Sequence, residues 1–337
     1  EDVKFHIPEG VAEHFRQGIG AQGKTLRDDW FTRINDYKAK YPELADQLYQ
    51  MQHRQLPDGW DKDLTAFPTD TKGLATRVSS GQVLNALGKR VPWLMGGSAD
   101  LAPSTKTRLT FDEAGDVSAE TPGGRNLHFG VREHAMAAIL NGMALVKVRA
   151  YGSGFLIFSD YARGGIRLGA IMELPVIHIF THDSIAVGED GPTHQPVEHL
   201  ASLRAMPGLI VIRPADANEV VAAWRVIMNL QHEPAALILT RQDVPTLDRN
   251  TYAPASGLAQ GAYILADSPT GKPEVILIGT GSEVSLCVAA YEQLKSQGIK
   301  ARVVSMPSWE LFEQEEQAYR DQVLPPAVTA RVAVEQA

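Results

Sequence analysis

Apolar and polar positions follow three successive patterns along this chain of 337 residues. Residues 1–70 are mostly polar, and their apolar positions are spaced three or four apart, as in Trp30, Ile34 and Tyr37. That spacing is typical of one face of a helix. Turn signals such as QLPDGW separate the helical stretches. We therefore expect residues 1–70 to form a helical linker and not a domain.

Residues 71–245 alternate short apolar runs with amphipathic segments. Met136, Ile139, Leu140 and Met143 have the spacing of one buried helix face. We expect helices over 79–90, 132–146, 159–172, 194–206 and 217–230, and strands within 92–100, 147–155, 175–183, 209–216 and 235–243. Such alternation predicts an α/β domain with an open, mainly parallel sheet covered by helices on both faces.

The alternation restarts in residues 246–337. Strands are expected within 274–281, 300–306 and 331–336, with helices over 282–298 and 308–323. The segment GTGSE, residues 279–283, is interpreted as a tight turn between a strand and a helix. We expect a second, smaller α/β unit that is incomplete.

Composition and charge exclude several classes of protein. The formal net charge of −8 disfavours binding to nucleic acid through phosphate neutralisation. No apolar run approaches the ~20 residues that a membrane-spanning helix needs, and the start shows no secretory signal. The single cysteine, Cys287, excludes an intrachain disulfide and favours a reducing compartment. We expect a cytoplasmic protein that binds neither nucleic acid nor membranes.

Polar residues gather where three of the expected strands end. The first strand leads into Ser98, Asp100 and Ser104, the third into Thr181, His182 and Asp183, and the last into Arg241 and Gln242. Some of these are expected to be helix caps. Ligands of open parallel sheets bind outside the carboxyl ends of the strands, so three such ends together indicate a site.

His178 and His182 lie on one face of the same strand, which raises the question of a metal pair. Four residues along a strand span about 13 Å, too far for one ion. We therefore expect no metal ligand here, an ordinary buried role for His178, and a functional role for His182.

The loop SIAVGEDGPTHQP, residues 184–196, follows directly. Its residues alone allow a solvated loop ahead of a helix, or a substrate loop that offers Asp190 and His194. Together with GGSADLAPS and GVREHAMAAILNGMAL, the segment THDSIAVGEDGPTHQP resembles the second half of transketolases. The resemblance covers almost the whole chain, is strongest from Thr71 to Arg241, and favours the substrate loop.

The resemblance implies thiamine diphosphate as cofactor and Glu133 as the catalytic glutamate, which hydrogen-bonds the aminopyrimidine ring. From its position alone, Glu133 would be an acid that stabilises a helix N-terminus. Phe155, Phe158 and Tyr161 match the aromatic pocket for that ring, although their spacing also fits a plain core stripe. Asp100 matches a position near the cofactor.

The resemblance also assigns substrate contacts. Arg77, Ser104, His182 and Arg241 match residues that bind the sugar phosphate, and such side chains can all donate hydrogen bonds to phosphate oxygens. Asp190 and His194 match positions that meet substrate hydroxyls and the reacting carbons, and His194 also neighbours the cofactor.

The implied activity is transfer of a two-carbon ketol unit between ketose and aldose phosphates, in pentose phosphate or Calvin-type sugar metabolism. Family members bind the diphosphate and Mg²⁺ through a GDG motif on an N-terminal domain, and this sequence contains no GDG. We expect a homodimer that needs that domain as partner, so that this chain alone is an inactive fragment or one subunit of a split enzyme. A dihydroxyacetone synthase-like enzyme and a non-catalytic dimerisation or regulatory module are the alternatives.

Overall fold

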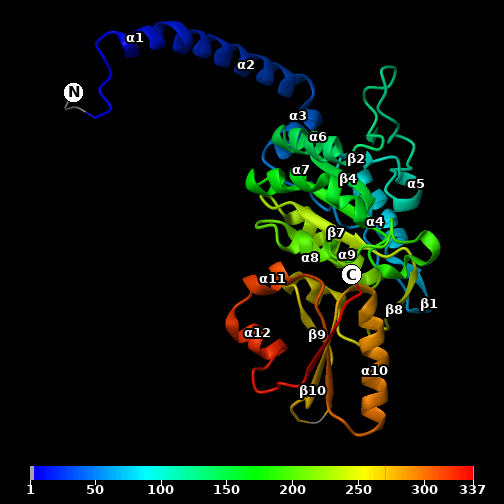
Figure 1. Ribbon diagram of the computed structural model, residues 1–337. Coiled ribbons are helices and arrows are strands. Elements are labelled where there is room, and N and C mark those ends of the chain that lie inside the picture. The colour runs from blue at the N-terminus through cyan, green and yellow to red at the C-terminus, as the bar shows by residue number, and fades with distance from the viewer. Residues whose placement is uncertain (1–3, 270, 337) are drawn as a thin grey trace. The chain divides into compact units, whose positions relative to one another are not determined.

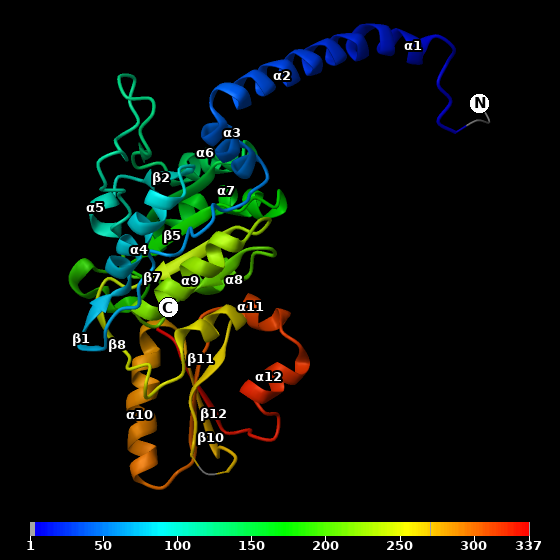
Figure 2. The ribbon, with the colours of Figure 1, turned by 180° about the vertical axis from the view of Figure 1, so that it is seen from behind.

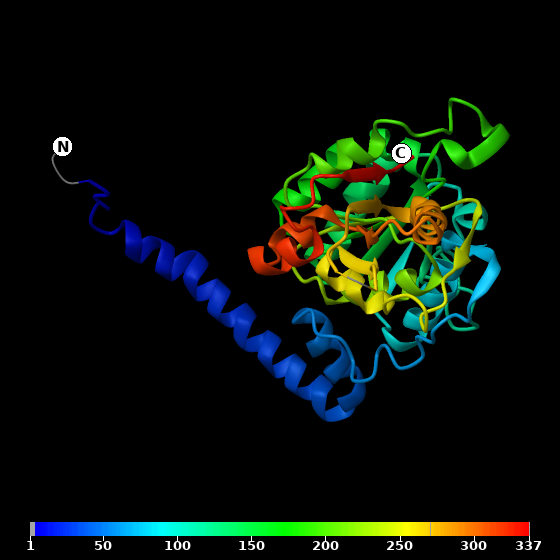
Figure 3. The ribbon, with the colours of Figure 1, turned by 90° about the horizontal axis from the view of Figure 1, so that it is seen from below.

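The computed structural model describes residues 4–269 and 271–336, which fall into two separate compact units, residues 1–55 and 56–337. The first unit is helical. It contains α1 (Val11–Phe15), the π-helical turn η1 (Arg16–Gly20), α2 (Ala21–Lys40) and α3 (Pro42–Gln52). These first three elements run on as one long helix, which Figure 3 shows most clearly. None of the four elements buries a residue, so this unit contributes no core.

The second unit is built around a six-stranded sheet in the order β3-β2-β4-β5-β7-β6 (Figure 1). All its neighbouring strands are parallel. The strands are β2 (Leu94–Ser98), β3 (Asn126–His128), β4 (Arg149–Phe155), β5 (Ile177–Thr181), β6 (Ile210–Ile212) and β7 (Ala235–Leu239). The predicted fold class is confirmed, and β3 was not foreseen.

Helices cover this sheet. A buried apolar cluster joins α6, α7 and α8 to β5, β6 and β7, and α4 packs against α9, where the Trp224 indole donates to Ser80 Oγ over 2.9 Å. The helices are α4 (Thr76–Arg90), α5 (Ala102–Thr105), α6 (Glu133–Leu145), α7 (Ser159–Ile171), α8 (His199–Arg204) and α9 (Ala217–Asn229). A separate antiparallel pair is formed by β1 (Asp70–Ala75) and β8 (Asp243–Thr246).

Two details of the sequence prediction are wrong. Ile139, expected on the buried face of α6 with Met136 and Leu140, is 47% exposed. The helix buries the positions Met136, Leu140 and Ala144, one turn apart, and Ile139 lies off that line. The helix expected over 194–206 begins at His199, because the residues before it belong to the loop.

A four-stranded sheet, in the order β12-β10-β11-β9, follows in the same unit. Its helix α10 lies on one side, and α11 and α12 lie on the other (Figures 1 and 2). The elements are β9 (Tyr263–Ala266), β10 (Val275–Gly279), α10 (Val284–Ser296), β11 (Ala301–Ser305), α11 (Trp309–Gln314), α12 (Gln317–Val323) and β12 (Arg331–Val334).

Sequence periodicity missed β9, which pairs antiparallel with β11. The single helix expected over 308–323 is two helices, because Glu315 is extended between them. Short 3-10 turns complete the unit: η2 (Leu156–Phe158), η3 (Ile185–Asp190), η4 (Ala255–Gln260) and η5 (Gly281–Glu283). Among the described helices, none combines the length and the apolar character needed to cross a membrane.

Candidate active site

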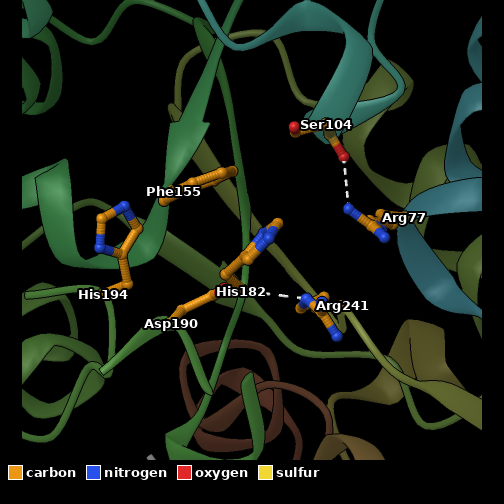
Figure 4. A pocket seen from close by; sticks show the side chains of 7 residues that line it. All are labelled: Arg77, Ser104, Phe155, His182, Asp190, His194 and Arg241. Carbon is orange, nitrogen blue, oxygen red and sulfur yellow. Dashed lines mark hydrogen bonds and ion pairs between the residues drawn. The ribbon is translucent and has the colours of Figure 1, made fainter. Parts of the chain in front are cut away.

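A cavity of about 390 Å³ opens at the carboxyl ends of the strands in the larger sheet. Figure 4 shows the seven side chains that line it: Arg77, Ser104, Phe155, His182, Asp190, His194 and Arg241. Phe155 ends β4, His182 follows β5, and Arg241 comes shortly after β7. These three strands are adjacent in the sheet, which is where ligands of open parallel sheets bind.

Arg77 and Arg241 reach this cavity from segments far apart in the sequence. Arg77 is the second residue of α4, and the residues before the two arginines, Thr76 and Thr240, are hydrogen-bonded to each other. Arg77 Nη1 donates to the Ser104 carbonyl oxygen over 2.7 Å, which brings α5 to the same rim. Two guanidinium groups and a serine therefore face one space.

The electrostatics of the cavity favour an anion. Burial and the nearby positive charge of Arg241 lower the pKa of Arg77 from its ordinary value. Arg77 Nε is buried and has no hydrogen-bond partner among the described residues. One carboxylate partly offsets the two cations, since Asp190 Oδ2 lies 3.7 Å from Arg241 Nε. A phosphate group would satisfy the unpaired donors.

His182 has an unusual backbone conformation and a neutral ring. Its φ is +60°, in the left-handed region that residues other than glycine rarely adopt. Burial, and then the positive charge of Arg77, lowers the pKa of His182 to about 4. Thr181 Oγ1 lies 2.9 Å from His182 Nδ1. When that hydroxyl donates, Nε2 keeps the ring proton and can donate to a ligand.

Aromatic rings form a row beside the cavity. The rings of Phe155 and Phe158 stack with centroids 5.9 Å apart, and those of Phe158 and Tyr161 with centroids 6.0 Å apart. His194 packs edge-on against Phe158, at 5.5 Å between centroids. The short 3-10 turn η2 between β4 and α7 creates this row. It offers a flat apolar surface on which a planar ring can stack.

Glu133 is the first residue of α6 and is 6% exposed. Its carboxylate accepts no hydrogen bond from the residues that the structure describes. Buried polar groups are normally hydrogen-bonded, so a carboxylate in this state suits a ligand that carries its own donor. Asp100 lies on the exposed turn after β2 with a φ of +63° and does not line the cavity.

Two of the polar residues at strand ends point elsewhere. Ser98 Oγ donates to the Ser153 carbonyl oxygen and accepts from the Leu101 amide, as a turn residue does. The Asp183 carboxylate is buried and accepts from Arg213 Nε over 2.8 Å. Sequence reasoning missed Arg213, although it directly follows β6 and so carried the same signal as His182 and Arg241.

Protein-family models match two parts of this chain. The transketolase pyrimidine-binding domain matches residues 72–246, and the transketolase-like C-terminal domain matches residues 261–337. The transketolase of Geobacillus stearothermophilus is 52% identical over 98% of the chain. This chain spans 49% of that relative's length, about half.

Solved structures are similar as well. A transketolase from Pichia stipitis in complex with sedoheptulose 7-phosphate superposes with a TM-score of 0.88 at 40% identity, covering 99% of this chain and 49% of that one. A structure described as a split-gene transketolase, an inactive β4 tetramer, has a TM-score of 0.61 at 27% identity. There the match covers 78% of this chain and 80% of that one.

Proposed function

This chain belongs to the transketolase family, and we propose that it supplies the pyrimidine-facing and phosphate-binding part of an active site that transfers a two-carbon ketol unit between ketose and aldose phosphates. One observation carries the proposal: two guanidinium groups, Arg77 and Arg241, converge on a cavity bordered by an aromatic row. The first feature fits the phosphate of a sugar, and the second fits the ring of a cofactor.

The residues fit thiamine diphosphate, which the family implies. Phe155 and Phe158 would stack on the aminopyrimidine ring, and the buried, unpaired carboxylate of Glu133 would accept a hydrogen bond from it. When bound, thiamine diphosphate would supply the carbon nucleophile and the electron sink for C–C cleavage. Glu133 would hold and release a proton at its carboxylate, in a place from which water is largely excluded.

The remaining cavity residues would bind and orient the sugar. Arg77 and Arg241 would hold the phosphate, with His182 Nε2 and the Ser104 hydroxyl as neutral donors. Asp190 would accept hydrogen bonds from substrate hydroxyls. His194 packs against the aromatic row and also faces the cavity, so it would meet both cofactor and substrate. Asp100 is retained as a weaker candidate near the cofactor.

Mg²⁺ is proposed to be bound by another part of the enzyme. Asp190 is the one carboxylate among the seven cavity residues, and it faces Arg241. Mg²⁺ prefers an octahedral set of oxygen ligands, which this cavity does not offer. We propose the N-terminal half of the same enzyme as the partner that carries the diphosphate and metal ligands. The half-length match to whole transketolases supports this proposal.

We also propose a homodimer that works in the cytoplasm, in pentose phosphate or Calvin-type sugar metabolism. Exposed apolar side chains on α6 and α7 support association with a second copy: Ile139, Leu145, Leu168, Ile171 and Met172. Cys287 is buried and unpaired, as suits a reducing compartment.

The test is transfer of two carbons from xylulose 5-phosphate to ribose 5-phosphate, with thiamine diphosphate and Mg²⁺. It is run on this chain alone and again with the N-terminal half of the same enzyme. We expect activity in the mixture and none from the chain alone. Glu133→Gln should abolish the activity, whereas Glu113→Gln, at an exposed position, should retain it. A well-folded mixture without activity, or full activity in Glu133→Gln, would contradict the proposal.

A further inference from the structure

The backbone at His182 needs external support. A φ of +60° costs a non-glycine residue of order 1 kcal/mol or more. The side chain of His182 faces the cavity (Figure 4), whereas that of the next residue, Asp183, is fully buried. Whatever holds Asp183 therefore also limits the backbone of His182.

Asp183 is held by Arg213, and Arg213 is held by the C-terminal part of the chain. Arg213 is fully buried, and its Nε donates to Asp183 Oδ2 over 2.8 Å. Its Nη1 donates to the Thr280 carbonyl oxygen over 2.7 Å and to the Glu283 carboxylate. Glu283 in turn accepts from the Gln336 amide over 3.1 Å. One guanidinium thus links the site segment to η5 and to the end of β12.

The turn GTGSE is shaped around this guanidinium. Gly281 has a φ of +60°. A Cβ atom placed on Gly281 would lie 2.7 Å from Arg213 Cζ and 2.7 Å from its Nε. A side chain here would displace Arg213, so the glycine is required by contact as well as by conformation. The turn that sequence alone presents as a plain strand-to-helix connection is therefore the seat of Arg213.

We propose that the C-terminal part of the chain positions His182 through Glu283, Arg213 and Asp183. The proposal deepens the proposed function and rests on it, since it gives η5 a role in substrate binding without contact with substrate. Glu283 and Gly281 are positioning residues. Removing one member of a buried ionic group leaves the others uncompensated, so a change at η5 reaches Asp183 and the backbone of His182.

A second buried carboxylate offers a matched control. Glu219 is also fully buried, and it accepts from the Tyr263 hydroxyl over 2.8 Å and the Ser305 hydroxyl over 2.7 Å. It therefore joins the same two parts of the chain, but none of its hydrogen bonds reaches Asp183 or Arg213. A purely structural role for Glu283 predicts that Glu283→Gln and Glu219→Gln behave alike.

A second pair of variants controls for backbone strain. Gly298 has a φ of +79°, and a Cβ there would meet nothing within 4 Å. Gly298→Ala therefore imposes a similar conformational strain without touching Arg213. Gly281→Ala imposes the strain and also displaces the guanidinium.

Two measurements test the proposal on the full chain. The first is the NMR signal of the His182 imidazole in histidine-labelled chain, assigned with His182→Gln. The second is KM and kcat for xylulose 5-phosphate in the chain combined with its N-terminal half. We expect Glu283→Gln and Gly281→Ala to shift the His182 signal and to raise KM at least fivefold, with a smaller change in kcat. Glu219→Gln and Gly298→Ala should do neither.

The proposal is overturned if the His182 signal and KM stay unchanged in Glu283→Gln, or if Glu219→Gln changes them equally. Should Gly281→Ala fail to fold, the Glu283→Gln comparison still decides. If the wild-type mixture transfers no ketol unit, the proposed function fails, and the NMR comparison still tests whether η5 positions His182.

Discussion

Thr76 and Thr240 exchange two hydrogen bonds across 164 positions of sequence. The Thr76 amide donates to Thr240 Oγ1 over 2.9 Å, and the Thr240 amide donates to Thr76 Oγ1 over 2.7 Å. Both residues are buried. This reciprocal pair fixes the start of α4 against the end of β7, and so sets the distance between Arg77 and Arg241.

Thr240→Val should weaken both stability and substrate binding. Valine has nearly the same shape but leaves the buried Thr76 amide without an acceptor, which costs about 1–3 kcal/mol. Because the arginines then lose their common support, KM for the ketose phosphate should rise several-fold. Urea unfolding and steady-state kinetics measure the two effects. Ser80→Ala, which deprives the buried Trp224 indole of its acceptor in the same helix, should lower stability and leave KM unchanged. An equal rise in KM in both variants would argue against the prediction.

Arg241→Gln should raise KM for the ketose phosphate by roughly 10- to 100-fold, with a smaller effect on kcat. The reason is that hydrogen bonds to charged groups contribute about 1.5–3 kcal/mol, and glutamine keeps a donor but loses the charge. Kinetics at several salt concentrations provide the measurement, since the wild-type KM should also rise with ionic strength. Lys89→Gln removes an exposed charge from the other end of α4 and should have no such effect. A fall in kcat at constant KM would assign Arg241 a different role.

Stability should fall between about pH 6.5 and pH 4 because of two buried histidines. Burial lowers the pKa of His178 to about 4, and the pKa of His182 is also lowered to about 4. Between these values and the ordinary histidine pKa, the unfolded chain binds more protons than the folded chain, so stability rises with pH and is complete above about 6.5. For His178 alone, acidification from pH 7.5 to pH 5 should cost about 2 kcal/mol.

His178→Phe isolates this contribution. His178 Nε2 is buried without a hydrogen-bond partner among the described residues, and the ring stacks against Phe180 with centroids 6.3 Å apart. Phenylalanine should therefore retain the fold at pH 7.5 and reduce the acid-induced loss, which urea unfolding at both pH values measures. If the variant and the wild type lose the same stability on acidification, the neutral state of His178 does not contribute.

Leu168→Glu should reduce self-association of the chain. Leu168 is exposed on α7, among the apolar side chains of α6 and α7, and a carboxylate there would have to be desolvated at an interface. Sedimentation velocity should show a dimer for the wild type and a lower mass for the variant. Leu286→Glu places the same charge at an exposed leucine on α10 and should leave the mass unchanged. A monomeric wild type would contradict the proposed dimer.

The sequence by itself determined the class of fold and part of the site. Alternating runs such as 175–183 and 217–230 identify β5 and α9, because their burial depends on a local period. Polar residues after such runs identified His182 and Arg241. The resemblance to transketolases selected Arg77, Ser104, Phe155, Asp190 and His194, which spacing alone left open, and the structure gathers all five around one cavity.

Only the tertiary structure decided which of these polar residues act together. Asp183 follows His182 in sequence, yet it turns to Arg213 and the C-terminal part of the chain. Thr76 and Thr240 meet because α4 begins where β7 ends, and no local pattern records that contact. Periodicity reports burial within one element, whereas strand order and long-range hydrogen bonds depend on how the elements pack. For that physical reason the two arginines could be selected from sequence, but their convergence on one cavity could not.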